Sequence, residues 1–153
     1  DWASAILAAD SALVTLPDDV ELLLWRAVLA ERDGDPTAAA AFLAQAHAAD
    51  VDPARLGIML GMKRLQAGDL EGAAAAAADV RQIDPSSSEA VFILASVAEA
   101  SGDRIQAITL FEEAAALAED NNPQMAVTSR MRLAGLLQQG PEMFEPQATE
   151  STP

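Results

Sequence analysis

Few residues in this chain have side chains suited to catalysis. His47 is the only histidine, and the 153 residues include neither cysteine nor tyrosine. The sequence contains no glycine-rich phosphate loop and no nucleophile elbow, which are the usual motifs of phosphoryl transfer and of serine-type hydrolysis. His47 lies among alanines, where we expect a solvated or packed imidazole and not a functional one. The sequence therefore predicts that the chain is not an enzyme and has no cofactor.

The acidic residues around Gly34 raise the question of a metal site. Asp33 and Asp35 flank the glycine, but the ligand spacing of an EF-hand calcium loop is missing. A turn at the end of a helix explains the same residues, because glycine enters the left-handed conformation without steric cost. The lack of cysteine excludes disulfides, thiol catalysis and cysteine-ligated zinc. We therefore predict no metal site.

The turn at Gly34 recurs at a fixed interval along the chain. Gly34, Gly68 and Gly102 are separated by 34 residues, and an aspartate follows each of them. Alanines recur at the same interval, at Ala39, Ala73 and Ala107. Self-similarity with a period of this length is typical of stacked helical hairpins. Each glycine is thus expected to end one helix and to begin the turn into the next.

These residues resemble the tetratricopeptide repeat (TPR), whose unit is also about 34 residues long. The Leu-Gly pair of the TPR pattern is matched by Leu60-Gly61, its Ala-x3-Phe pattern by Ala107 and Phe111, and its closing proline by Pro85. The tryptophan position of the pattern instead holds smaller side chains, at Leu23, Gly57 and Val91. The resemblance implies an all-α superhelix of antiparallel helix hairpins.

We expect about three repeats, with half a repeat before them and a capping helix after them. The expected parts are a half unit at 1–19, units at 20–53, 54–87 and 88–121, and a capping helix at 124–139, which together make one domain over residues 1–140. Residues 141–153 contain three prolines and three glutamates, with little apolar surface to bury. That composition predicts a disordered tail.

The composition limits the possible partners. Nine Lys and Arg residues stand against 24 Asp and Glu residues, giving a formal net charge of −15. Such a surface repels phosphates, so nucleic acids and anionic membranes are poor partners, whereas a basic or apolar protein segment is favoured. The apolar stretches are too short for a membrane span, so we expect a soluble domain without membrane insertion. Periplasm and cytoplasm both remain open as compartments.

The TPR resemblance also implies where a partner would bind. In such arrays the first helices of successive units line a concave groove, and their side chains here are mainly apolar. The residues expected to line this peptide-binding groove are Leu24, Val28, Arg55, Ile58, Met62, Phe92 and Ser96. The alternative is that these side chains contact a neighbouring helix or a further repeat, and for Trp25, Met59 and Ile93 this core interpretation is favoured.

Three functions remain in view at this stage. The first is a non-enzymatic scaffold that binds a peptide or an amphipathic helix, apolar with a basic flank, of another protein. The second is a self-associating segment of a longer TPR protein. The third follows from a narrower resemblance, carried by the stretches 106–112 and 131–137, to periplasmic TPR domains that hold apocytochrome c during haem attachment. Those domains bind the carboxyl-terminal helix of the apocytochrome.

Overall fold

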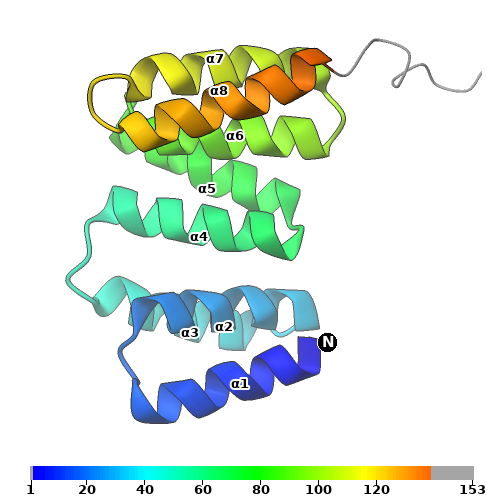
Figure 1. The fold of residues 1–153 in the computed structure, drawn as a ribbon. Helices are drawn as coiled ribbons and strands as arrows, with labels where there is room; N and C mark the ends of the chain where they lie inside the picture. Colours follow the sequence, from blue (N-terminus) through cyan, green and yellow to red (C-terminus); the bar gives the residue numbers. More distant parts are fainter. Residues whose placement is uncertain (1, 139–153) are drawn as a thin grey trace, which may run out of the picture.

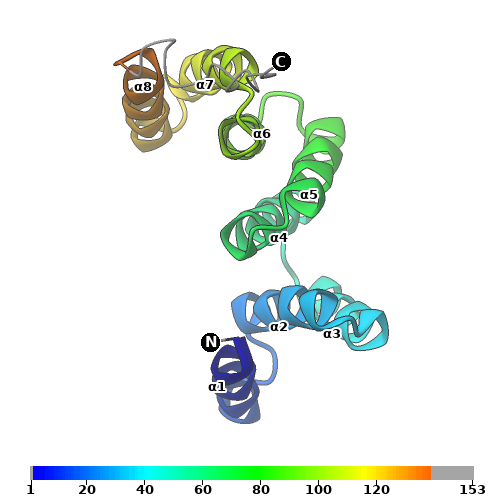
Figure 2. The ribbon, with the colours of Figure 1, turned by 90° about the vertical axis from the view of Figure 1, so that its right-hand side faces the viewer.

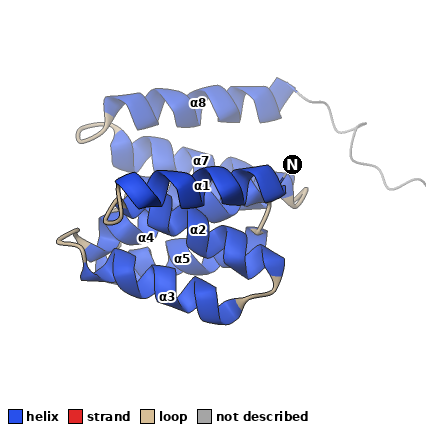
Figure 3. Cartoon of the chain, turned by 90° about the horizontal axis from the view of Figure 1, so that it is seen from below, coloured by secondary structure: helices blue, strands red, loops and turns tan. Residues whose placement is uncertain are grey.

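Residues 2–138, the part of the chain that the computed structural model describes, form eight helices and no strand (Figures 1 and 3). The helices are α1 (Trp2–Thr15), α2 (Val20–Asp33), α3 (Pro36–Ala48), α4 (Pro53–Ala67), α5 (Leu70–Ile83), α6 (Ser88–Ala100), α7 (Arg104–Ala118) and α8 (Pro123–Gln138). The predicted all-α superhelix of helix hairpins is thereby confirmed. The predicted tail, residues 141–153, lies outside the described residues.

The sequence marks both ends of these helices with specific residues. At most helix starts an Asp or Ser side chain accepts a hydrogen bond from the backbone N–H three residues later; Asp69 Oδ1, for example, accepts from the N–H of Gly72 at 2.9 Å. This contact satisfies a backbone donor that has no partner within the helix. Gly34, Gly68 and Gly102 have φ angles of 80°, 81° and 81°. The 34-residue period is therefore a period of left-handed turns.

We expect Gly68→Val to lower the free energy of unfolding by about 1–2 kcal/mol, because a side chain makes the left-handed conformation costly. No other group lies within 4 Å of a Cβ built at Gly68, so the effect would come from the backbone conformation alone. Urea denaturation followed by circular dichroism measures the change. Glu71→Ala, on the exposed side of α5, is the control. Equal midpoints for the two variants would contradict this account of the turn.

The helices pack as successive pairs, and one helix of each pair also contacts a helix of the next. Helix α2 packs on α3, α4 on α5, and α6 on α7. In addition α2 contacts α4, α4 contacts α6, and α6 contacts α8, and we call these four the inner helices. Figure 2 shows the pairs along an arc; in this view α2 and α4 lie on the left of their pairs, and α3 and α5 lie on the right. Because α3, α5 and α7 make no comparable contacts with one another, the inner helices connect the repeats, together with the packing of α5 on α6.

Small side chains allow α4 and α5 to approach each other closely. On α5, Ala73, Ala76 and Ala77 are buried. On α4, a Cβ added at Gly57 would lie 2.5 Å from Val80 Cγ2, which is closer than real Cβ contacts allow. The pair α4 and α5 therefore packs largely through backbone and methyl groups.

Large side chains hold the carboxyl-terminal end of the solenoid together. Phe111 on α7 is fully buried and meets Phe92 on α6 edge to face, with 5.5 Å between the ring centroids. Leu136 on α8 belongs to the same apolar cluster. One cluster thus joins α6, α7 and α8.

Candidate functional site

Four of the residues expected to line the groove are buried between helices. Leu24 packs in an apolar cluster with Leu23 and with Leu56 of α4. Phe92 packs toward α7 and α8, and the Ser96 hydroxyl donates a hydrogen bond to the Phe92 carbonyl oxygen at 2.9 Å. Val28 is also buried. For these four residues the contacts match the alternative interpretation, in which the side chains pack against a neighbouring helix.

The three remaining groove residues lie on α4, in the middle of the inner row. Ile58 and Met62 are half-buried and pack against the cluster that contains Ala90 and Ile93, both on α6. Arg55 is exposed at the first turn of α4. Among the predicted groove residues, those that keep accessible surface therefore lie on α4. We call the surface around Arg55, Ile58 and Met62 the inner surface. Whether it binds a peptide remains a prediction.

Arg55 borders a recess of about 410 Å³ at the amino-terminal ends of α2 and α4. Four carboxylates line it with Arg55 and Met59; they belong to Asp19, Glu21, Asp50 and Asp52. Among residues 2–138 no group of three or more His, Cys, Asp or Glu side chains is placed to hold a metal ion. The recess thus gives the edge of the inner surface an acidic character.

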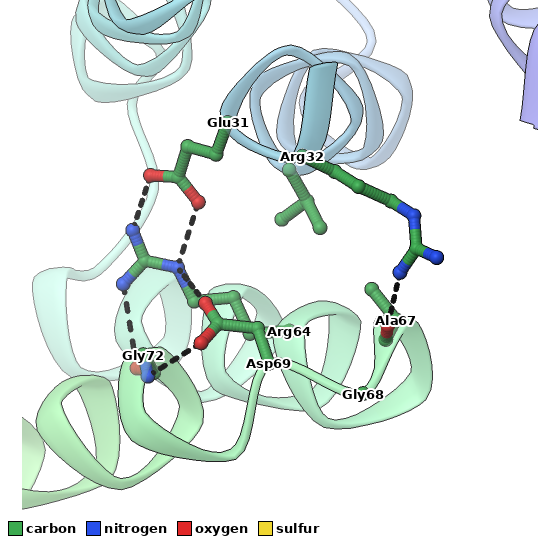
Figure 4. A pocket seen from close by; sticks show the side chains of 8 residues that line it. Glu31, Arg32, Arg64, Ala67, Gly68, Asp69 and Gly72 are labelled. Carbon is green, nitrogen blue, oxygen red and sulfur yellow. Dashed lines mark hydrogen bonds and ion pairs between the residues drawn. The ribbon is translucent and has the colours of Figure 1, made fainter. Parts of the chain in front are cut away.

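The opposite ends of α2 and α4 are joined by a charged contact (Figure 4). Arg64 on α4 donates to both carboxylate oxygens of Glu31 on α2, with 2.5 Å from Nη2 to Oε1 and 3.2 Å from Nε to Oε2. The Arg64 guanidinium also lies 3.7 Å from Asp69 and donates to the Gly72 carbonyl oxygen at 3.4 Å. Such a two-point arginine–carboxylate pair fixes orientation as well as distance.

Arg32 completes this contact from the last turn of α2. Its guanidinium donates to the Ala67 carbonyl oxygen at 3.1 Å and lies over the Trp2 ring, 4.1 Å from the centroid. A recess of about 420 Å³ lies between these groups. Because the guanidinium of Arg64 is matched by Glu31 and Asp69, we interpret the contact as a structural joint between repeats.

A second charged contact joins the same two helices. Lys63 is buried on α4; it forms an ion pair with Glu21 of α2 and lies 5.1 Å from the centroid of the Trp25 ring. The lysine stem is thus packed while its ammonium group is paired, as a buried cation requires. The roles of Lys63 and Arg64 were not predicted from the sequence. Opposite charges about one repeat apart, as at Glu31 and Arg64, were the available signal.

The comparisons with known proteins agree with this architecture. A family profile described as tetratricopeptide repeat matches residues 1–53 and 58–138. The chain therefore belongs to the tetratricopeptide repeat family. This membership and the fold indicate a scaffold for protein–protein interaction, a role that generally involves no catalysis. No helix within residues 2–138 has the length and apolar character needed to cross a membrane.

Among solved structures, the chain is similar to PcrH from Pseudomonas aeruginosa, with 23% identity and a TM-score of 0.57. The match covers 78% of this chain and 92% of PcrH. Two MamA structures match with 20% and 19% identity and TM-scores of 0.47 and 0.44. They cover 90% of this chain in both cases, and 78% and 87% of MamA. No curated protein sequence matches the chain significantly.

Proposed function

We propose that the chain binds a segment of another protein against its inner helices, with Ile58 and Met62 at the centre of the contact. The observation that carries the proposal is the unbroken row from α2 to α8, with half-buried apolar side chains of α4 in its middle. A helix or an extended segment laid across such a row buries apolar surface on several repeats at once.

The charges around this surface define the partner further. Asp19, Asp50 and Asp52 line the recess beside Arg55, at the amino-terminal ends of α2 and α4. The partner we propose is therefore apolar on one face and carries Lys or Arg beside it. Met62 suits such a partner because its flexible, polarisable side chain adapts to different shapes. The buried residues Ala90 and Ile93 of α6 pack against Ile58 and Met62 from within the core.

The carboxyl-terminal helix of an apocytochrome c remains one candidate ligand of this kind. It belongs in a panel of synthetic amphipathic peptides that carry basic residues beside an apolar face. Peptides with the same composition in scrambled order provide the matched controls. Fluorescence anisotropy with labelled peptides gives the dissociation constant for each.

Met62→Glu is expected to raise the dissociation constant of the tightest-binding peptide at least about tenfold, which corresponds to about 1.4 kcal/mol of binding free energy. The reason is that a carboxylate would have to lose its water against an apolar ligand face. The control is Ile105→Glu on α7, where the native side chain is 81% exposed and lies outside the inner row. Circular dichroism verifies that both variants fold. The proposal fails if Met62→Glu and Ile105→Glu bind as the unaltered chain does, or if no peptide in the panel binds.

A further inference from the structure

A separate apolar cleft lies between α3 and α5, with α4 as its floor. Its volume is about 240 Å³, and its lining includes the buried side chains Leu24, Leu56 and Val80. Ile83, at its edge, is 60% exposed. Pockets for drug-sized molecules have volumes of about 300–1,000 Å³. The cleft is therefore of a size for one or two protein side chains.

Comparison with the next repeat shows how the polar groups of this cleft differ from their counterparts. A shift of 34 residues relates His47 to Arg81 and Asp79 to Glu113. Between α5 and α7, Arg81 and Glu113 form an ion pair with 2.9 Å between Nη2 and Oε1. Between α3 and α5, His47 and Asp79 both line the cleft but form no ion pair with each other. In addition, α5 packs on α6, whereas α3 makes no comparable contact with α4.

The polar groups at the cleft favour a positively charged neighbour for any apolar side chain that enters it. Three titratable groups line it: His47 from α3, Arg64 from α4 and Asp79 from α5. Arg64 is already paired with Glu31. Asp79 is exposed and forms no ion pair within the described residues. A fitting ligand thus presents a large apolar side chain with an arginine or lysine next to it.

Helix α8 carries a side chain of this kind on its outer face. Met131 is 70% exposed, and Val127 and Leu137 on the same helix are also exposed. Arg130 and Arg132 flank Met131 and keep about half of their side-chain surface exposed, although they pair with Glu119 and Glu99. Ion pairs at such exposed positions contribute little, so the arginines can exchange partners at low cost.

Two other apolar segments fit the cleft less well. Helix α1 exposes Leu7 and Val14, but it contains no basic residue. The pair Met143-Phe144 is flanked by Glu142 and Glu145, which Asp79 would repel. Charge complementarity therefore favours α8.

We propose that α8 of one copy of this chain docks into the cleft of a second copy, with Met131 in the cleft and one of its flanking arginines beside Asp79. The two surfaces in this contact differ, so a pair of copies keeps one free cleft at one end and one free α8 at the other. Such a head-to-tail contact extends into a chain of copies unless it closes into a ring. The contact uses surfaces other than Ile58 and Met62 and is independent of the proposed function.

Sedimentation velocity of the full chain over a range of concentrations tests the contact. We expect the sedimentation coefficient of the unaltered chain to rise with concentration. Met131→Glu on α8 and Ile83→Glu at the cleft should each remain monomeric, with association weakened at least about tenfold. Both native side chains are largely exposed, so both variants should fold. Asp79→Arg should likewise prevent association, because it places like charges together.

A mixture of the two monomeric variants provides the decisive measurement. The Ile83→Glu copy retains its α8, and the Met131→Glu copy retains its cleft. An equimolar mixture should therefore form dimers and nothing larger. The proposal is overturned if the unaltered chain stays monomeric, if the mixture stays monomeric, or if Val14→Glu abolishes association that the cleft variants retain. Peptide binding by Ile83→Glu, measured in parallel, should equal that of the unaltered chain.

Discussion

Phe111→Ala is expected to lower the free energy of unfolding by about 3–5 kcal/mol. The Phe111 side chain is fully buried, and its ring lies edge to face with that of Phe92. Its removal would leave a cavity in the cluster that joins α6, α7 and α8, and that cluster also contains Leu136. The loss combines apolar transfer energy, the cavity and the aromatic contact. Urea denaturation followed by circular dichroism measures it directly.

Ile105→Ala on the same helix is the matched control for this prediction. Ile105 is 81% exposed, so its truncation should change the free energy of unfolding by no more than about 0.5 kcal/mol. The comparison separates the effect of burial from that of shortening a side chain on α7. Similar losses for the two variants would show that the Phe111 cluster is not the core of this end of the molecule.

Gly57→Ala is expected to destabilise the fold by about 1–3 kcal/mol, although alanine is the better helix former. The added methyl group would lie 2.5 Å from Val80 Cγ2, so α4 and α5 would have to separate or Val80 would have to rotate. Thermal and urea unfolding both report the change. The effect would show that close approach of these two helices, and not glycine flexibility, explains the residue.

Gly135→Ala provides the same substitution in a helix without the contact. No atom outside its own helix turn lies within 4 Å of a Cβ at Gly135, so this variant should gain up to about 1 kcal/mol from helix propensity. The double variant Gly57→Ala, Val80→Ala should lose less stability than the sum of the two single losses, since Val80→Ala removes the clashing methyl group. Stabilisation by Gly57→Ala alone would refute the close packing of α4 on α5.

The helices could be predicted from the sequence because their ends are encoded locally. Glycine at a left-handed turn followed by an aspartate cap is a short-range signal, and its repetition at Gly34, Gly68 and Gly102 gave the period. The pairing of helices followed from the period and from the TPR resemblance. The helix ends and the helix pairs could both be predicted without knowing how closely successive repeats pack.

The accessible part of the inner surface could not be predicted in the same way. The period assigns Leu24, Ile58 and Phe92 to equivalent positions, yet Leu24 and Phe92 are buried while Ile58 is half-buried. Leu24 packs in a cluster with Leu56 of the next inner helix, and Phe92 in a cluster with Leu136. Ile58 instead packs against a cluster to which the next inner helix contributes the small side chain of Ala90 as well as Ile93. Such burial is decided by contacts between repeats, which a single repeat does not encode.

The cleft between α3 and α5 was predictable only in part. The sequence shows that the position occupied by Arg81 in one repeat is occupied by His47 in the repeat before it. The shape of the cleft also depends on how α3 and α5 pack on their neighbours, because α5 packs on α6 whereas α3 makes no comparable contact with α4. A sequence period thus identifies which positions are comparable, and the packing decides how they differ.

Binding at the inner helices is tested most directly by mapping a bound peptide on the isotopically labelled chain by nuclear magnetic resonance. We expect the largest amide shifts from the tightest basic, amphipathic peptide to cluster around Arg55, Ile58 and Met62, with weaker shifts on the facing sides of α2 and α6. Shifts confined to α3, α5 and α7, with the α4 residues unchanged, would contradict the proposed function.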